Sequence, residues 1–290
     1  MSWAPAQKSR MLLLLMAFAS TTFCGCAMLF NKNSGEELTR AATNVEPAIH
    51  RDAICLDIAV ADRPATDSLV ALLWDDVDEI GVLEAADKRL LNANGFRIGV
   101  AGSSVPSSLQ TILQEAVAEQ GAEQNWSPIG NQLPGSSKVT LFNKQDTLFE
   151  VTQLGELAYV EVDENGDPIS DPESFNNSRC VVRLTAEKMQ DGWIKLRFLP
   201  EVHHGANANR PTVGDAGFQY KQSQRMKPLY QYQFEVTLNP GEIAVVGGNE
   251  ADEHTLGQQF FNIKLPTGFA QKIITVRFVE TANLTASRTE

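Results

Sequence analysis

The sequence predicts an α+β protein in which a small N-terminal α/β domain precedes a mainly antiparallel β domain. Before residue 122 the apolar residues recur mostly at helical spacing, and beyond residue 138 they recur at every second position. Residues 123–137, between these patterns, include two prolines and two glycines and are typical of a linker. With 43% hydrophobic residues, a chain of 290 residues can bury a core in each domain.

The N-terminal α/β domain is expected over residues 51–122, in the order strand, helix, helix, strand, helix. Residues 53–60 alternate weakly between apolar and polar and predict a strand. Asp67 is a good N-cap for the first helix, because its carboxylate can accept from the free N–H groups of the first turn. The apolar residues of that helix recur at helical spacing and are Leu69, Val70, Leu73, Trp74 and Val77.

A second helix is expected over residues 82–91. It ends at Asn94-Gly95, because glycine takes the left-handed conformation readily at a helix C-terminus. Residues 96–101 then predict a strand. Pro106 favours the start of a third helix, which runs to residue 120 with its apolar residues on one side.

The β domain is expected over residues 138–280. Short β-like runs between residues 139 and 162 are followed by the turn signal Asn165-Gly166. Further on, two β-like runs flank Asp191-Gly192, and both of these residues tolerate the positive φ of a two-residue turn. A long β-hairpin is therefore predicted from residue 179 to residue 202.

Residues 230–238 alternate strictly between apolar and polar, which predicts a strand with one buried face. Residues 239–242 match a type II turn, because proline fixes φ at the second position and glycine supplies positive φ at the third. Residues 243–246 return as a buried strand that ends at Gly247-Gly248. The remaining predicted elements are strands at residues 260–265 and 272–279 and a polar tail at residues 281–290.

The N-terminus carries the pattern of an export signal. Two basic residues precede an unbroken apolar run over residues 11–19, which is well short of the roughly 20 residues that cross a bilayer. The following Phe23-Cys24-Gly25-Cys26 resembles the lipobox of bacterial lipoproteins. The resemblance implies that residues 1–25 are a cleaved signal peptide and that Cys26 carries lipid. Residues 31–47 are polar and lack periodicity, so a flexible tether is expected over residues 26–50. A plain cleaved signal peptide and a short membrane anchor are the alternatives.

The formal net charge of -12 argues against nucleic acid as a partner. Phosphate repels an acidic protein, and no run rich in Lys and Arg offers a local basic patch. The same charge argues against attraction to anionic lipid, so membrane attachment would come from acyl chains on the N-terminal cysteine, each buried CH₂ contributing about 0.8 kcal/mol.

Two of the four cysteines, Cys55 and Cys180, fall in the part of the chain that is expected to fold. In an oxidising compartment they can form one disulfide, which would contribute roughly 3 to 5 kcal/mol. Two unpaired buried thiols are an equal alternative.

No catalytic motif is recognisable, so no catalytic residue, metal or cofactor is expected. The chain has no G-x-S-x-G elbow, no H-E-x-x-H and no P-loop. His203-His204 beside Glu201 is the one cluster whose residue types suit zinc. Neighbours on a strand point to opposite faces, so the two imidazoles are not expected to converge on one ion, and the start of a polar loop is expected there.

An ordered set of short motifs runs from residue 179 to residue 261. A strand and a D-G turn lead to a strand ending in Leu-Pro-Glu-Val, then to a polar loop over residues 203–226, an alternating strand, and a turn into Val-Val-Gly-Gly. The residues that carry the pattern are Asp191, Gly192, Pro200, Glu201, Val202, Arg225, Gly241, Glu242, Val245, Val246, Gly247 and Gly248. In this order the motifs resemble the C-terminal domain of bacterial secretins, the ring-forming outer-membrane proteins of type II and type III secretion.

The resemblance implies that copies of the chain assemble into a ring by pairing their edge strands. Residues 69–99 also resemble uncharacterised envelope proteins of planctomycetes, which implies a compartment and no activity. We therefore expect a non-enzymatic cell-envelope lipoprotein, anchored by lipid at the outer membrane and facing the periplasm, whose partners are other copies of itself or secretion-system proteins. A monomeric lipoprotein that binds a protein or glycan through a β sandwich is the alternative, and an envelope hydrolase is a distant third.

Overall fold

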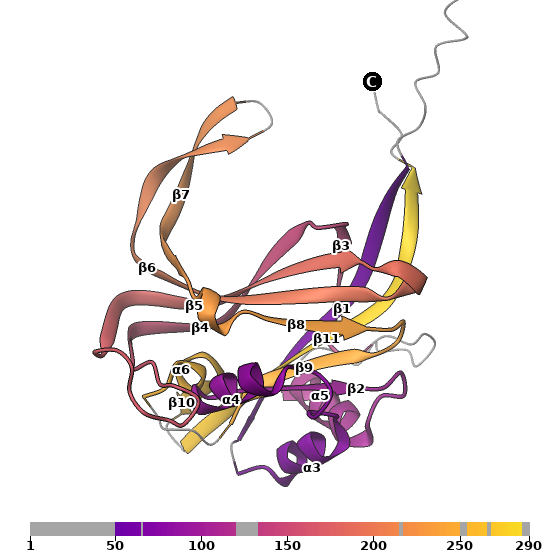
Figure 1. Cartoon of the computed structure of the whole chain (residues 1–290), viewed down its shortest axis with the longest axis horizontal. Helices are drawn as coiled ribbons and strands as arrows, with labels where there is room; N and C mark the ends of the chain where they lie inside the picture. The colour runs from indigo at the N-terminus through magenta and orange to yellow at the C-terminus, as the bar shows by residue number, and fades with distance from the viewer. Residues whose placement is uncertain are drawn as a thin grey trace, which may run out of the picture. The chain divides into compact units, whose positions relative to one another are not determined.

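Two antiparallel sheets and a layer of helices make up the protein in the computed structural model (Figure 1). The structure describes residues 50–64, 66–119, 133–214, 217–249, 254–265 and 268–285. Neighbouring strands in both sheets are antiparallel, so the predicted class, mainly antiparallel β with helices, is confirmed. The predicted signal peptide, Cys26, nearly all of the tether and most of the linker lie outside the described residues.

Sheet A combines strands from both ends of the described chain. In spatial order its strands are β2 (Phe96–Ala101), β9 (Ile243–Gly248), β11 (Gly268–Thr285), β1 (His50–Pro64) and β3 (Ser137–Phe142), with β10 (Asn262–Leu265) paired to β11. The longest ladder joins β1 to β11, from His50 opposite Thr285 to Pro64 opposite Ala270.

Sheet B comes from the middle of the chain. In spatial order its strands are β4 (Asp146–Tyr159), β5 (Glu173–Lys188), β6 (Ile194–Gly214) and β7 (Gly217–Pro228), with β8 (Phe234–Leu238) paired to the first part of β6. The β5–β6 hairpin confirms the prediction, but its connection is a 3₁₀ turn, η1 (Gln190–Gly192). Gly192 has a positive φ there and Asp191 does not, because the longer connection needs only one left-handed residue.

The N-terminal helices form close to where the sequence predicts them. These helices are α3 (Ser68–Asp76), α4 (Ala85–Ala93) and α5 (Ser107–Glu119). Asp67 caps α3 as predicted, because its carboxylate accepts from the N–H of Leu69 at 2.9 Å. A further short helix, α6 (Leu256–Phe261), takes part of a stretch expected as strand. Within the described ranges, no helix has both the length and the apolar character needed to cross a membrane.

Sheet A is covered on both faces (Figure 1). One core lies between the two sheets and includes Leu56 of β1, Phe198 of β6 and Val246 of β9. A second core lies on the other face of sheet A, where α3 and α5 contribute Trp74 and Ile112. All six residues of β9 are buried, because alternate side chains enter the two cores.

The two predicted domains, residues 51–122 and 138–280, are corrected to one structural unit. β2 pairs with β9 and β1 pairs with β11, so both strands of the predicted first domain have neighbours in the predicted second domain. The turn after α4 also contacts α6, where the N–H of Gly257 donates to the carbonyl of Asn94 at 2.7 Å. Local periodicity predicts elements, but it does not indicate which distant strands will pair.

Three shorter stretches also differ from their predictions. The predicted polar loop over residues 203–226 instead continues β6 and forms β7. Residues 230–238 begin with a 3₁₀ turn, η2 (Tyr230–Tyr232), which leaves Tyr230 exposed and buries Tyr232. Residues 281–285 extend β11 instead of starting a polar tail. Residues 217–226 form a strand because they pair with β6, and residues 281–285 remain in a strand because they pair with β1.

Cys55 and Cys180 are free thiols, so the disulfide alternative is wrong. Cys55 lies on β1 in sheet A, whereas Cys180 lies on β5 in sheet B and donates to the carbonyl of Gln259 at 3.8 Å. Burial raises the pKa of the Cys180 thiol, which is therefore protonated at neutral pH.

Candidate functional site

A two-stranded ribbon rises from sheet B (Figure 1). β5 pairs with β6 only as far as His203, whereas β6 pairs with β7 as far as Gly214. Beyond His203, β6 and β7 have only each other as partners among the described strands. We call residues 204–214 and 217–225 the arm.

Where the side chains of the arm are described beyond its root, both of its faces lie in solvent. Residues 206–209 are all exposed, although consecutive side chains of a strand point to opposite faces. On β7, Arg225 is exposed and Tyr220 has an exposed fraction of 79%. These residues contribute to neither core, so pairing between the two strands is what holds the arm together.

The root of the arm is fixed by a bulge and by Gln224. The register of β6 and β7 shifts between His204 and Ala208, and Gly205 in this stretch has a φ of 78°. The buried amide of Gln224 donates to the carbonyls of Asn177 at 2.7 Å and Gly205 at 2.9 Å. Its oxygen accepts from Arg179 at 2.7 Å. Because a bulge bends its strand, these bonds set the angle at which the arm leaves sheet B.

Glu201, one of the motif residues, lies beneath this root with an exposed fraction of 1%. Arg183 donates to its Oε1 at 2.6 Å, and the Nε2 of His203 lies 2.8 Å from its Oε2. Burial by itself would raise the pKa of Glu201, but the hydrogen bonds with His203 and Arg183 outweigh burial and hold the pKa below its ordinary value. Arg183 also pairs with Asp146, so one charge network links β4, β5 and β6.

A second cluster supports β7 at the same root. The ammonium of Lys227 pairs with Glu173, donates to the hydroxyl of Tyr159 at 3.2 Å, and lies 5.6 Å from the ring centroid of Phe175. The rings of Phe175 and His204 also pack together, with centroids 4.5 Å apart. Burial and the nearby carboxylate of Glu173 raise the pKa of the Tyr159 hydroxyl, which therefore stays neutral.

The motif residues divide between the two sheets and do not form one site. In sheet B, Pro200, Glu201, Val202 and Arg225 lie near the arm root, while Asp191 and Gly192 lie at the far end of the β5–β6 hairpin. In sheet A, Val245, Val246, Gly247 and Gly248 belong to β9. Gly241 and Glu242 form the predicted type II turn before β9, with a φ of 92° at Gly241 and a 3.0 Å bond from the N–H of Glu242 to the carbonyl of Asn239.

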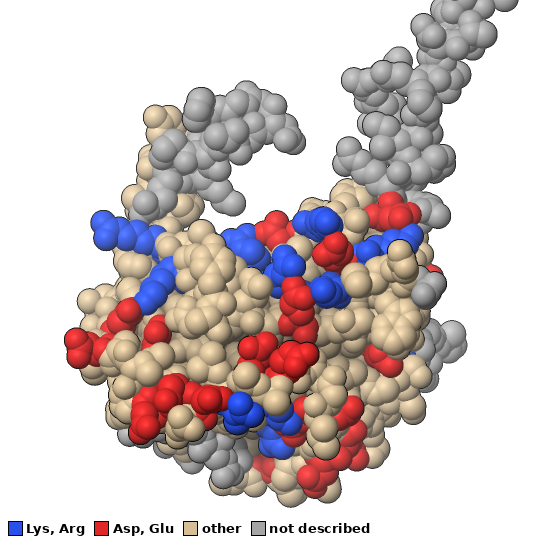
Figure 2. Space-filling view, viewed as in Figure 1, with Lys and Arg blue, Asp and Glu red and all other residues tan. Residues whose placement is uncertain are grey.

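Figure 2 shows one face of the molecule in the same view as Figure 1. Basic side chains gather on the half of that face nearest the arm, and acidic side chains lie among them. On sheet B, for example, Lys195 and Arg197 both pair with Glu235, at 3.0 Å and 2.7 Å. In the part of the chain that the structure describes, no three His, Cys, Asp or Glu side chains come together as a metal site. His203 and His204 have different partners, as the alternation along a strand predicts.

The chemistry of this surface has to be inferred from its own residues. No protein-family model, no curated protein and no solved structure matches this chain significantly. What the described residues offer is an exposed pair of strands on a root held by hydrogen bonds and ion pairs. Such a surface is suited to pairing with another protein strand.

Proposed function

We propose that this chain is a non-enzymatic cell-envelope lipoprotein whose secretin-like β domain assembles with other copies of the chain through the arm. The exposed two-stranded arm carries this proposal. An isolated pair of strands is at best marginally stable in water, and a further strand or a packed face is needed for stability. No further described strand pairs with the outer edge of β7, so a strand from another molecule can pair with the N–H and C=O groups there.

A second copy is the partner that charge favours. Sheet B ends in β7 on one side and in β4 on the other, and neither edge pairs with a further described strand. β7 contains three basic residues and no acidic one, whereas β4 contains three acidic residues and no basic one. Lys227, Asp146 and Glu150 already form ion pairs within the chain. Among the described side chains, Arg225 on β7 and Glu156 on β4 therefore carry the attraction between the β7 edge of one copy and the β4 edge of the next. Head-to-tail contacts of this kind produce rings when the rotation closes, which agrees with the secretin resemblance.

The envelope location is supported by the sequence. The leader pattern and Cys26 predict a lipid anchor, and we propose an outer-membrane position facing the periplasm. Tethering copies to one surface raises their effective concentration and favours assembly through weak edges. Secretion-system proteins are further partners for the same edges. The alternative, a monomer that binds a protein or glycan, is supported by the core shared between the two sheets, which needs no second copy.

The test is the size of the detergent-extracted mature protein, measured by native electrophoresis and analytical ultracentrifugation. We expect a large assembly that dissociates as salt is raised, because salt screens the attraction between the edges. Arg225→Glu on β7 should shift the assembly toward monomer. Arg89→Glu on α4 makes the same change of charge at an exposed position outside both edges and should leave the size unchanged.

Two results would count against the proposal. A wild-type monomer at every salt concentration would remove assembly and leave the tethered binding protein. An assembly that Arg225→Glu and Arg89→Glu affect equally would remove the arm from the interface. Cys26→Ser tests the anchor separately, because the variant should appear in the soluble fraction without detergent.

A further inference from the structure

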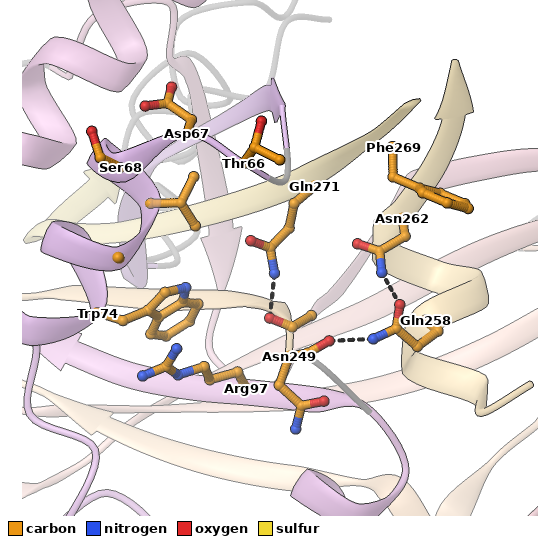
Figure 3. A pocket seen from close by; sticks show the side chains of 13 residues that line it. Thr66, Asp67, Ser68, Trp74, Arg97, Asn249, Gln258, Asn262, Phe269 and Gln271 are labelled. Carbon is orange, nitrogen blue, oxygen red and sulfur yellow. Dashed lines mark hydrogen bonds between the residues drawn. The ribbon is translucent and has the colours of Figure 1, made fainter. Parts of the chain in front are cut away.

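A pocket of about 550 Å³ lies on the helix side of sheet A, away from the arm (Figure 3). It is bordered by α3 and the residues just before it, by β2, by the end of β9, by α6 and by the starts of β10 and β11. The volume falls in the range of small-molecule sites. The residues that matter below are Trp74, Arg97, Asn262, Phe269 and Gln271.

Trp74 brings an unsatisfied hydrogen-bond donor to this pocket. Its exposed fraction is only 4%, and its indole N–H finds no acceptor among the described residues. In Figure 3 the nitrogen-bearing edge of the ring is turned toward Gln271. A buried donor without a partner costs about 1 to 3 kcal/mol and is rare in folded proteins. A ligand that accepts from this N–H would remove that cost.

Side-chain amides form the opposite wall and are held in fixed orientations. Asn262 donates to Gln258, which in turn donates to the carbonyl of Asn249. Gln271 donates to the carbonyl of Gly248, and Figure 3 shows its oxygen turned toward α3. Each amide nitrogen gives one of its two N–H groups to a protein acceptor, which fixes the orientation of the amide, and the amide oxygens of Gln271 and Asn262 can accept from a ligand. The pocket therefore offers fixed acceptors facing a buried donor.

The charged groups in the lining are already neutralised. Arg97 pairs with Glu79 at 2.8 Å, and its guanidinium lies over the Trp74 ring, 4.5 Å from the centroid. Asp67 pairs with Arg63 and caps α3. No formal charge in the described lining is left for an anionic or cationic ligand to pair with.

We propose that this pocket binds a neutral saccharide. A sugar hydroxyl can accept from the Trp74 N–H while it donates to the oxygen of Gln271, and polar groups of both kinds converge here. Phe269 lies at the rim with an exposed fraction of 50% and offers an apolar face to the C–H side of a sugar ring. The saccharide site is independent of the arm, so either proposal can fail while the other holds.

The test is nuclear magnetic resonance of the full mature chain with ¹⁵N-labelled indole groups. Cellobiose and N,N′-diacetylchitobiose are the saccharide probes, and N-acetyl-trialanine amide, called trialanine below, is the uncharged peptide probe. Trp74→Phe removes one indole signal and so assigns it. We expect at least one disaccharide, and not trialanine, to shift this signal as the N–H gains an acceptor.

Affinity provides a second readout. Trp74→Phe and Gln271→Met should each weaken disaccharide binding about fivefold, as expected for one hydrogen bond. Trp193→Phe is the matched control, because Trp193 lies outside the pocket. No shift of the Trp74 signal at millimolar disaccharide, an equal shift with trialanine, or undiminished binding by both pocket variants in a folded protein would overturn the proposal.

Discussion

Gly257→Ala is expected to destabilise the protein strongly, because α6 and the turn after α4 meet backbone to backbone at this glycine. An added Cβ would lie 2.7 Å from the nitrogen of Phe96 and closer still to the carbonyl group of Gly95, whereas real Cβ atoms essentially never come within 3.0 Å of a heavy atom outside their own and adjacent residues. Side-chain rotation cannot relieve a clash with backbone, so the segments must separate. The 2.7 Å bond from the Gly257 N–H to the carbonyl of Asn94 would then lengthen or break.

Three contributions set the size of the effect of Gly257→Ala. Overpacking in a close contact costs up to about 3 kcal/mol, and the lost hydrogen bond costs about 1 kcal/mol. Alanine returns about 1 kcal/mol, because it restricts the unfolded chain and favours the helix. The net loss is up to about 3 kcal/mol, which corresponds to a fall in Tm of at most roughly 6 to 12 °C for a protein of this size.

Urea denaturation followed by circular dichroism measures this loss. Gly102→Ala is the matched control, because an added Cβ there has no neighbour within 4 Å and the residue does not need positive φ. We expect Gly102→Ala to change the free energy of unfolding by less than about 1 kcal/mol. A loss below about 1 kcal/mol for Gly257→Ala as well would refute the close approach of α6 to Gly95.

Three further predictions concern buried polar groups. Asn94→Leu should cost about 3 kcal/mol in urea denaturation, because the buried amide bonds both backbone groups of Val162 and the hydroxyl of Tyr232; a near-neutral effect would contradict that network. The stabilisation that Glu201 contributes should be complete above about pH 5 and be lost as the pH falls below 4.5, because the pKa of Glu201 is lower in the folded state than its ordinary value of 4.5; Glu201→Gln should remove this part of the acid sensitivity in urea denaturation, and an unchanged pH profile would contradict it. Cys180 should resist iodoacetamide until the protein unfolds, since its thiol is buried with a raised pKa, and labelling of the native protein at the rate of an exposed thiol would contradict this.

Local sequence patterns correctly predicted the elements that form through interactions between residues close together in the sequence. Asp67 caps α3 because its carboxylate reaches the first turn, and the glycine of residues 239–242 turns the chain because only glycine takes that φ without strain. The pairing of β2 with β9 has no local cause. It depends on long-range contacts between residues about 150 positions apart, which periodicity does not report. For this reason the elements were largely right and the division into domains was wrong.

The arm and the pocket were harder to predict. Residues 206–209 read Ala-Asn-Ala-Asn, which has no apolar period, and the one available signal was the pair Gly214 and Gly217, which face each other at the end of the arm. The pocket brings together residues from widely separated parts of the sequence. Trp74 had a helical spacing typical of a core residue, and most of its ring is indeed in a core. Its unpartnered N–H is visible only once its surroundings are known.

The ladder between β1 and β11 determines how the protein responds to mechanical load. The first residue of β1 and the last residue of β11 lie side by side at one corner, whereas the arm rises at another (Figure 1). Force between the two chain ends would break the hydrogen bonds of this ladder one after another, starting at His50 and Thr285. Force between the N-terminal end and the arm would instead load the hydrogen bonds of several strands together. A molecule held by lipid at one end and by a neighbour at the arm would thus be pulled along its stronger direction.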